Sequence, residues 1–381
     1  MQILSRLFLV IPFVLLFLSD VLFSETGDVC NGEVGFRILQ LYDNSRPSLS
    51  APDESHVSGR FMQLSVWYPS NQKNSKQVSF GDLVALSATE LNPKNSNDVS
   101  KKNAIDDFIN EVMKRGVVNE KQLQSLMTRK TDAFWNAPSM DGKFPVIVFA
   151  HSTPPAEHLM AESLARCGFI VGAVNSKGTI ERDYRLSIPD IETMVTDTML
   201  VLAALRSLPG ADQDRAGIIG MSNGAFAAVL AHLRNPQIST IVSLDGTIGE
   251  QAANRILPKD PYFDPAKIRA SILHLYTTGN PYLTLEPIHS FVHSERTLVA
   301  MPGMRHYDFL AYGFYESIIP GFLGSPPTDH SSGFELVSRF TIQFFLAKLA
   351  SVEDSRKFLE SALMKNPAPD WIQSITSEKP E

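Results

Sequence analysis

The chain has little clustered positive charge, and this shortage excludes nucleic acid as an expected partner. Its 34 Lys and Arg residues are outnumbered by 41 Asp and Glu residues, so the net charge at pH 7 is −7. Binding to a phosphate backbone requires clustered Lys and Arg side chains. Phosphate-binding loops and zinc-finger spacings of Cys and His are also missing from the sequence.

The amino-terminal apolar run is too short to span a membrane. The segment Leu7–Leu18 has 12 residues, follows Arg6 and is interrupted by Pro12, whereas a spanning helix needs roughly 20 apolar residues. We therefore predict that residues 1–24 form a secretory signal peptide, with cleavage near Ser24. An uncleaved anchor is the alternative. Export would place the protein in the periplasm or outside the cell.

Cysteine is scarce, with Cys30 and Cys167 as the two cysteines of the chain. In an oxidising compartment a disulfide between them could persist, but the sequence does not supply the geometry that a bridge needs. The alternative for Cys167 is a small buried residue beside Gly168. Neither cysteine is assigned a catalytic role.

Residues 25–366 are expected to form one domain, followed by a disordered tail at residues 367–381. The stretches 34–42 and 61–69 mix apolar and polar residues as strands do, and a turn-rich segment separates them. They predict an antiparallel hairpin at a sheet edge. Residues 71–140 form an insertion in which apolar residues recur at helical spacing, which predicts two amphipathic helices. These helices either form a cap over a pocket or cover the sheet edge.

From residue 144 onward, short β-branched apolar runs alternate with helix-like stretches. This pattern is typical of an α/β fold with a mostly parallel, doubly wound sheet. Strands are predicted at 144–150, 169–174, 216–220, 239–244, 271–277 and 296–301. Helices are predicted at 156–166, 190–207, 224–234 and 333–350.

The strongest local signal is the segment Gly217–Phe226, which contains the pattern Gly-x-Ser-x-Gly. A short apolar run precedes Ser222, and an Ala-rich, helix-forming segment follows it. A serine on a sharp strand-to-helix turn has an exposed hydroxyl, and Gly220 and Gly224 avoid collisions around such a turn. The context predicts a nucleophile elbow at Ser222, with an ordinary turn serine as the alternative.

Candidates for an acid and a base follow downstream of Ser222. In a parallel sheet, catalytic groups gather where the strands end. The strand after the elbow ends at Asp245, and the loop after the last parallel strand carries His306. This chain order is that of α/β hydrolases. The next strand ends at Asn280, whose side chain cannot hold a negative charge. The alternatives are a capping role for Asp245 and a surface-loop position for His306.

These three residue types suit acyl transfer. Ser222 is a weak nucleophile until His306 accepts its proton, which the imidazole later returns to the leaving alcohol. Asp245 would hold the imidazole in the required tautomer and stabilise its positive charge. Such a reaction needs neither a metal nor an organic cofactor.

The oxyanion of the tetrahedral intermediate requires two hydrogen-bond donors. The backbone N–H of Asn223, directly after the nucleophile, is the first. The second is expected from the loop after the first parallel strand, where Pro154 and Pro155 have no N–H. We therefore predict the N–H of Thr153 as the second donor.

Other polar and aromatic residues are assigned to other roles. The rivals of His306 as the base are His151, His274, His289 and His293. His151 is expected to shape the oxyanion loop, and His274 is expected to pack inside a strand. Asp308 is either a turn residue or a partner of the residues around His306. Asp197 is expected to be solvated or in a surface ion pair. Packed core is favoured for Trp135, Phe309 and Leu310, with a surface that contacts a membrane transiently as the alternative.

Several motifs resemble the platelet-activating-factor acetylhydrolase group of α/β hydrolases and the related bacterial "predicted dienelactone hydrolase" proteins. They are His151-Ser-Thr, Gly168-Phe-Ile-Val, Gly-Met-Ser222-Asn-Gly, Ser-Leu-Asp245-Gly, the loop around His306, Val34-Gly-Phe-Arg and Val66-Trp-Tyr-Pro. The resemblance covers about residues 33–70 and 144–350. It implies Ser222 as nucleophile, Asp245 as acid, His306 as base, and Thr153 and Asn223 as oxyanion donors.

The chain departs from this group in the oxyanion loop and in the insertion. Family members commonly have glycine after the loop histidine, whereas this chain has Ser152 and then a Pro-Pro pair. The loop is therefore expected to be stiffer and the acyl pocket to be reshaped. The insertion at 71–140 matches no part of the family. Dienelactone hydrolases use a cysteine nucleophile, so Ser222 argues against that activity.

The residues thus predict an exported serine esterase that cleaves short-acyl carboxylic esters. The resemblance implies acetyl or oxidised-acyl phospholipids as substrates, so the expected partner is a small ester or a lipid. The same triad would also serve a polyester, amide or peptide hydrolase. A third hypothesis is an inactive α/β-hydrolase scaffold that acts as a binding module.

Overall fold

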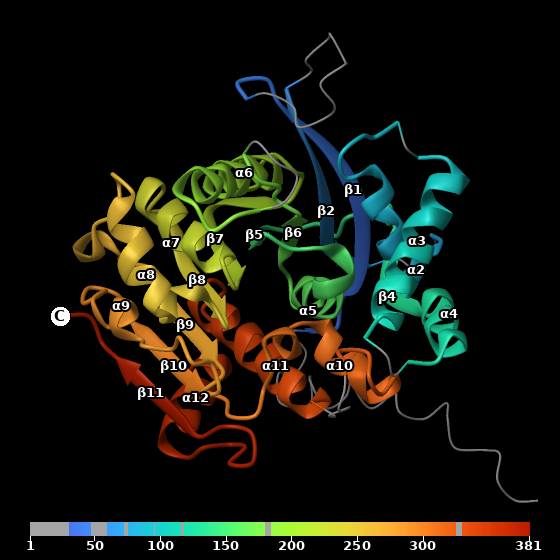
Figure 1. The fold of residues 1–381 in the computed structure, drawn as a ribbon. Coiled ribbons are helices and arrows are strands. Elements are labelled where there is room, and N and C mark those ends of the chain that lie inside the picture. Colours follow the sequence, from blue (N-terminus) through green and yellow to red (C-terminus); the bar gives the residue numbers. More distant parts are fainter. Residues whose placement is uncertain are drawn as a thin grey trace, which may run out of the picture.

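The computed structural model describes residues 30–46, 59–71, 75–94, 96–115, 118–179, 184–324 and 330–381. The predicted signal peptide at residues 1–24 lies outside this part. A single eleven-stranded sheet runs through the described residues in the order β11-β10-β9-β8-β7-β5-β6-β2-β1-β4-β3 (Figure 1). The strands are β1 (Glu33–Asp43), β2 (Arg60–Ser70), β3 (Gln77–Ser79), β4 (Lys130–Trp135), β5 (Phe144–Ala150), β6 (Ile170–Val174), β7 (Ala211–Met221), β8 (Ile238–Leu244), β9 (Ser271–Tyr276), β10 (Arg296–Ala300) and β11 (Ser374–Glu378).

A continuous parallel block is formed by the neighbouring strands β6, β5, β7, β8, β9 and β10. Within it, β5 pairs in parallel with β6 and β7, and β7, β8, β9 and β10 follow as parallel neighbours. All their carboxyl ends therefore open at one edge of the sheet. The prediction of a mostly parallel sheet from residue 144 onward is confirmed.

Helices cover both faces of this sheet, because alternate strand residues point to opposite sides. On β5, Ile147 and Phe149 belong to one hydrophobic core, and Val146 and Val148 belong to the other. The first core is covered by α5, α10 and α11 and the second by α6 and α7. The helices are α2 (Phe80–Ala85), α3 (Asp98–Met113), α4 (Glu120–Thr128), α5 (Pro154–Arg166), α6 (Ile188–Arg206), α7 (Gly224–Arg234), α8 (Gln251–Ile256), α9 (Glu286–His289), α10 (Ala311–Ile318), α11 (Ser331–Lys348) and α12 (Glu353–Met364).

The predicted antiparallel hairpin of β1 and β2 is present, but its predicted place at the sheet edge is wrong. β2 pairs with β6 on one side, and β1 pairs in parallel with β4 on the other. β3 then pairs with β4 and forms the edge. The hairpin lies inside the sheet because two strands of the insertion continue it.

The insertion at residues 71–140 contains the two predicted helices, α3 and α4, together with α2, β3 and β4, which the periodicity did not indicate. Figure 1 shows this unit beside β1, at the end of the sheet opposite β11. Its strands extend the sheet edge, and its helices α2 and α3 line a cavity. The role of the insertion as a cap stays a prediction.

Asp197 is not solvated, contrary to the sequence-based expectation. It lies on α6 with an exposed fraction of 0%. Arg60 donates to both of its carboxylate oxygens at 3.0 and 2.8 Å, and Arg46 lies 2.7 Å away. A buried carboxylate needs such partners, and they come from the β1–β2 hairpin, which is distant in the sequence.

The expectation of a disordered tail at residues 367–381 is also wrong. Residues Ser374–Glu378 form β11, which pairs antiparallel with β10. Pairing with β10 satisfies backbone groups of this short polar segment, and local sequence pattern does not reveal a partner so distant in the sequence.

Cys30 and Cys167 form a disulfide that joins the segment just before β1 to the C-cap residue of α5. The sequence left this pairing open. A disulfide fits an exported protein, because such bonds persist in oxidising compartments. Among the described residues, no helix combines the length and apolarity that crossing a membrane requires.

Candidate active site

Ser222 stands on a strained turn between β7 and α7. Its φ is +52°, which is uncommon for a residue other than glycine. A Cβ on Gly220 would lie 2.5 Å from the backbone nitrogen of Ala225, and one on Gly224 would lie 2.3 Å from the carbonyl oxygen of Ala150. The turn can therefore be this tight only with glycine at both positions. The geometry is that of the predicted elbow.

Strand register brings Ser222 beside Asp245. Met221 on β7 is paired with Leu244 on β8, so the next residue of each strand leaves the sheet at the same level. The N–H of Ser222 donates to the carbonyl of Leu244 at 3.2 Å, and the N–H of Thr247 donates to the carbonyl of Ser222 at 3.1 Å. Backbone hydrogen bonds thus join Ser222 to Leu244 before Asp245 and to Thr247 after it. The φ of Asp245 itself is +42°.

Asp245 is paired with His306. Nδ1 of His306 lies 2.6 Å from Oδ2 of Asp245, and the N–H of Thr277 donates to Oδ1 at 3.1 Å. The carboxylate is buried, whereas the imidazole is partly exposed. Since a carboxylate only accepts hydrogen bonds, Nδ1 carries the proton and Nε2 is left as the acceptor.

The loop that carries His306 is held by a buried carboxylate. Asp308 has an exposed fraction of 0% and accepts from the backbone N–H of Arg305 at 2.6 Å and from its guanidinium at 3.0 Å. Nδ1 of His330, at the start of α11, bonds to the same carboxylate. Asp308 is therefore more than a turn residue, because it ties both sides of His306 to α11.

The two predicted oxyanion donors stand at helix amino termini. Thr153 is the N-cap residue of α5, whose first two positions are Pro154 and Pro155, and Asn223 is the N-cap residue of α7. Proline suits the first helical turn because its missing N–H would have no partner there. Helix amino termini favour negative charge, so both positions suit a developing oxyanion.

A buried carboxyl group lies close behind Thr153. Glu157 has an exposed fraction of 2%, and its oxygens have no well-formed hydrogen bond among the described residues. Burial raises the pKa of Glu157 well above its usual range, and the Thr153 N–H only partly offsets this effect. Sequence reasoning missed this residue, since a Glu in the first turn of a helix is ordinary.

The rival histidines have other partners. Nδ1 of His151 donates to the carbonyl of Ser176 at 3.2 Å, which ties the oxyanion loop to the end of β6. His274 is buried in β9 beside Ser243, and burial lowers its pKa to about 4. His289 and His293 contact Glu378 and Glu381 near the carboxyl end of the chain.

The bulky residues considered for a membrane-facing surface are not exposed together. Phe309 and Leu310 have exposed fractions of 0% and 7%, respectively. Trp135 is half-buried, with its ring 4.9 Å from that of Phe36. The packed-core interpretation therefore holds for Phe309 and Leu310.

A second carboxylate, missed by the sequence analysis, lies near the Asp245–His306 pair. Glu250 accepts from the amide of Asn280 at 2.8 Å. Burial raises the pKa of Glu250 and the charge of Asp245 raises it further, against the lowering effects of Asn280 and His306. Asn280, which follows β9 and cannot itself carry a negative charge, thus binds the carboxylate of Glu250.

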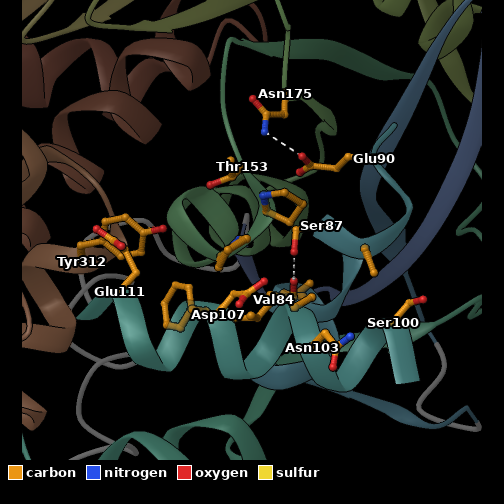
Figure 2. Close-up of a pocket in the computed structure, with 16 residues that line it drawn as sticks. Val84, Ser87, Glu90, Ser100, Asn103, Asp107, Glu111, Thr153, Asn175 and Tyr312 are labelled. Atoms are coloured by element: carbon orange, nitrogen blue, oxygen red, sulfur yellow. Dashed lines mark hydrogen bonds between the residues drawn. The ribbon is translucent and has the colours of Figure 1, made fainter. Parts of the chain in front are cut away.

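A cavity of about 670 Å³ adjoins the oxyanion loop. Figure 2 shows α3 along one side, with Asn103, Asp107 and Glu111, and shows Thr153 and Asn175 on the other. Tyr312 of α10 closes one end. The volume of the cavity is that of a small-molecule site. The insertion therefore contributes one wall of a pocket whose other wall carries a predicted oxyanion donor.

Comparison with known proteins supports the fold. No family model matches the chain, and no curated protein matches it. Among solved structures, it is similar to a ferulic acid esterase from Streptomyces cinnamoneus, with 19% identity and a TM-score of 0.57. The match covers 84% of this chain and 91% of that one. The chain has the α/β-hydrolase fold. At this identity the likeness extends to the fold alone, so membership of the platelet-activating-factor acetylhydrolase group remains a prediction.

Proposed function

We propose that this α/β-hydrolase chain is an exported serine hydrolase of carboxylic esters. The observation that carries the proposal is the short hydrogen bond between His306 and Asp245, at 2.6 Å, beside a strained serine elbow. A buried carboxylate that fixes an imidazole tautomer beside an elbow serine is the arrangement that activates a serine nucleophile.

In the first half of the reaction, Oγ of Ser222 attacks the ester carbonyl while Nε2 of His306 accepts the serine proton. The N–H groups of Thr153 and Asn223 stabilise the oxyanion. The bond from the carbonyl carbon to the alcohol oxygen then breaks, and His306 gives its proton to the leaving alcohol. In the second half, water attacks the acyl-enzyme, His306 takes a proton from it, and that proton returns to Ser222 as the acid is released.

We further propose short-acyl esters as substrates, with acetyl or oxidised-acyl phospholipids as the lipid class. The motifs shared with the platelet-activating-factor acetylhydrolase group support this choice. The structural neighbour, a ferulic acid esterase, is consistent with ester hydrolysis in general.

The test is hydrolysis of p-nitrophenyl esters, from acetate upward, by the chain lacking residues 1–24. Ser222→Ala and His306→Ala should each lower kcat by about a thousandfold or more. Ser361→Ala is the matched control, because this serine lies on α12 and its hydroxyl donates to the carbonyl of Phe358 within the same helix. Full activity of Ser222→Ala would refute the proposal. A folded wild type that hydrolyses no ester would favour the scaffold hypothesis instead.

A further inference from the structure

The cavity between the insertion and the oxyanion loop has an unusual charge pattern. Sixteen residues line it; Glu90, Asp107 and Glu111 are carboxylates, and none is Lys, Arg or His. A substrate group that carries a negative charge would be repelled there, because the lining residues that the structure describes include no cation to compensate it.

Lysines outside the cavity neutralise two of these carboxylates. Lys177 lies 3.0 Å from Oε2 of Glu90, and Lys114 lies 3.1 Å from Glu111. The amide of Asn175 also donates to Oε2 of Glu90 at 3.0 Å. Asp107 is then the one lining carboxylate without an ion pair among the described residues, so the wall still repels an anion but does not require a cationic ligand.

The wall presents acceptor oxygens together with amide and hydroxyl donors. Within the described residues, no hydrogen bond reaches Oε1 of Glu90, and Asp107 has neither an ion pair nor a hydrogen bond. The hydroxyl of Ser87 is already donated to the carbonyl of Val84 at 2.9 Å. Uncharged hydroxyl groups suit this wall because each can donate to the acceptor oxygens and accept from the amide of Asn103 or the hydroxyl of Ser100.

Topology indicates which part of an ester would enter the cavity. Thr153 and Asn175 follow β5 and β6, on one side of β7 and Ser222, whereas Asp245 follows β8 on the other side. In the proposed reaction the leaving alcohol takes its proton from His306, which is bonded to Asp245. The alcohol is therefore expected to depart on that side, and the acyl group to extend toward Thr153, which lines the cavity.

We propose that this cavity is the acyl-binding site and that it takes an uncharged, hydroxylated acyl group while rejecting an anionic one. Phe108, Leu83 and Val84 supply an apolar floor for the carbon chain, and the acceptors of the wall bind its hydroxyl groups. This inference rests on the proposed esterase function, because it assumes an acyl group on Ser222.

The test keeps the leaving group constant and varies the acyl group. Wild type is assayed with the p-nitrophenyl esters of butyrate, 3-hydroxybutyrate, succinate as the monoester, and 3-aminopropionate. We expect kcat/KM for 3-hydroxybutyrate to exceed that for butyrate by about fivefold to tenfold. We expect the succinate monoester to fall at least about tenfold below butyrate.

Charge variants separate repulsion by this wall from other causes. Asp107→Asn with Glu111→Gln should raise the ratio of succinate to butyrate hydrolysis by about tenfold. Asp106→Asn is the matched control, since Asp106 lies on the same helix, pairs with Lys102 and does not line the cavity. This control should leave the ratio unchanged.

The outcomes distinguish this inference from the proposed function. If Ser222→Ala abolishes all hydrolysis while butyrate and 3-hydroxybutyrate are cleaved equally, the serine mechanism stands and the acyl-site inference fails. If 3-aminopropionate is the preferred ester, the site selects cations and the inference is wrong. An unaltered succinate ratio in the double variant would also overturn it.

Discussion

Replacing Asp245 by Asn tests the central contact of the site with almost no change of shape. The two oxygens of Asp245 accept from two donors, the backbone N–H of Thr277 at 3.1 Å and Nδ1–H of His306 at 2.6 Å. An Asn side chain has one acceptor oxygen and one donor NH₂ group, so it cannot accept from both.

The structure indicates which contact is lost in Asp245→Asn. A backbone N–H cannot move its proton, whereas an imidazole can shift its proton between Nδ1 and Nε2. The amide oxygen of the introduced side chain therefore faces Thr277, and its NH₂ group faces His306. Nδ1 then becomes the acceptor and the proton moves to Nε2, which can no longer take a proton from Ser222.

We expect this change to lower kcat by about ten-thousandfold, or about 5 kcal/mol in the activation barrier, with little effect on folding. The assay is p-nitrophenyl acetate hydrolysis from pH 6 to 10, with thermal unfolding as the check on folding. Asp214→Asn is the control, because Asp214 is exposed at the opposite end of β7. A variant that keeps more than about a tenth of the activity would show that Asp245 is not the acid.

Two further predictions concern stability. Burial raises the pKa of Glu157 above its ordinary value of 4.5. When the pH rises above 4.5, the unfolded chain releases a proton that the folded chain keeps. The free energy of unfolding then falls by up to about 1.4 kcal/mol per pH unit. The unfolding temperature of Glu157→Gln relative to that of wild type should therefore rise between pH 5 and pH 8. A difference in unfolding temperature that stays constant over this range would contradict this prediction. The disulfide joins residues 137 positions apart, so Cys30→Ala with Cys167→Ala should lower the free energy of unfolding by about 3–5 kcal/mol in guanidinium titrations. A loss below about 1 kcal/mol would mean that the bridge contributes little to stability.

Local sequence pattern determined the parallel block of the sheet and the elbow. Alternating and continuous apolar runs define the strands, and the glycines around Ser222 are needed because backbone atoms lie within 2.5 Å of where a Cβ would be. Asp245 and His306 were predictable because strand ends in a parallel sheet meet at one edge. Their hydrogen bond bears out their expected proximity, while their catalytic roles remain a proposal.

Long-range contacts were decided only by the tertiary structure. Asp197 is buried because two arginines from the β1–β2 hairpin reach it, and no pattern within α6 carries that information. The edge position of β3, the pairing of β11 with β10 and the Cys30–Cys167 bond depend in the same way on segments distant in sequence.

The candidate pocket shows the same division most clearly. The sequence by itself predicted two helices, α3 and α4, ahead of the core strands, because helical spacing of apolar residues is a local property. It did not determine that Asp107 faces Thr153 and Asn175 across one cavity, or that Glu90 accepts from Asn175 at 3.0 Å. That placement follows from the pairing of β4 with β1, since strand pairing joins segments whose partners cannot be read from either segment alone.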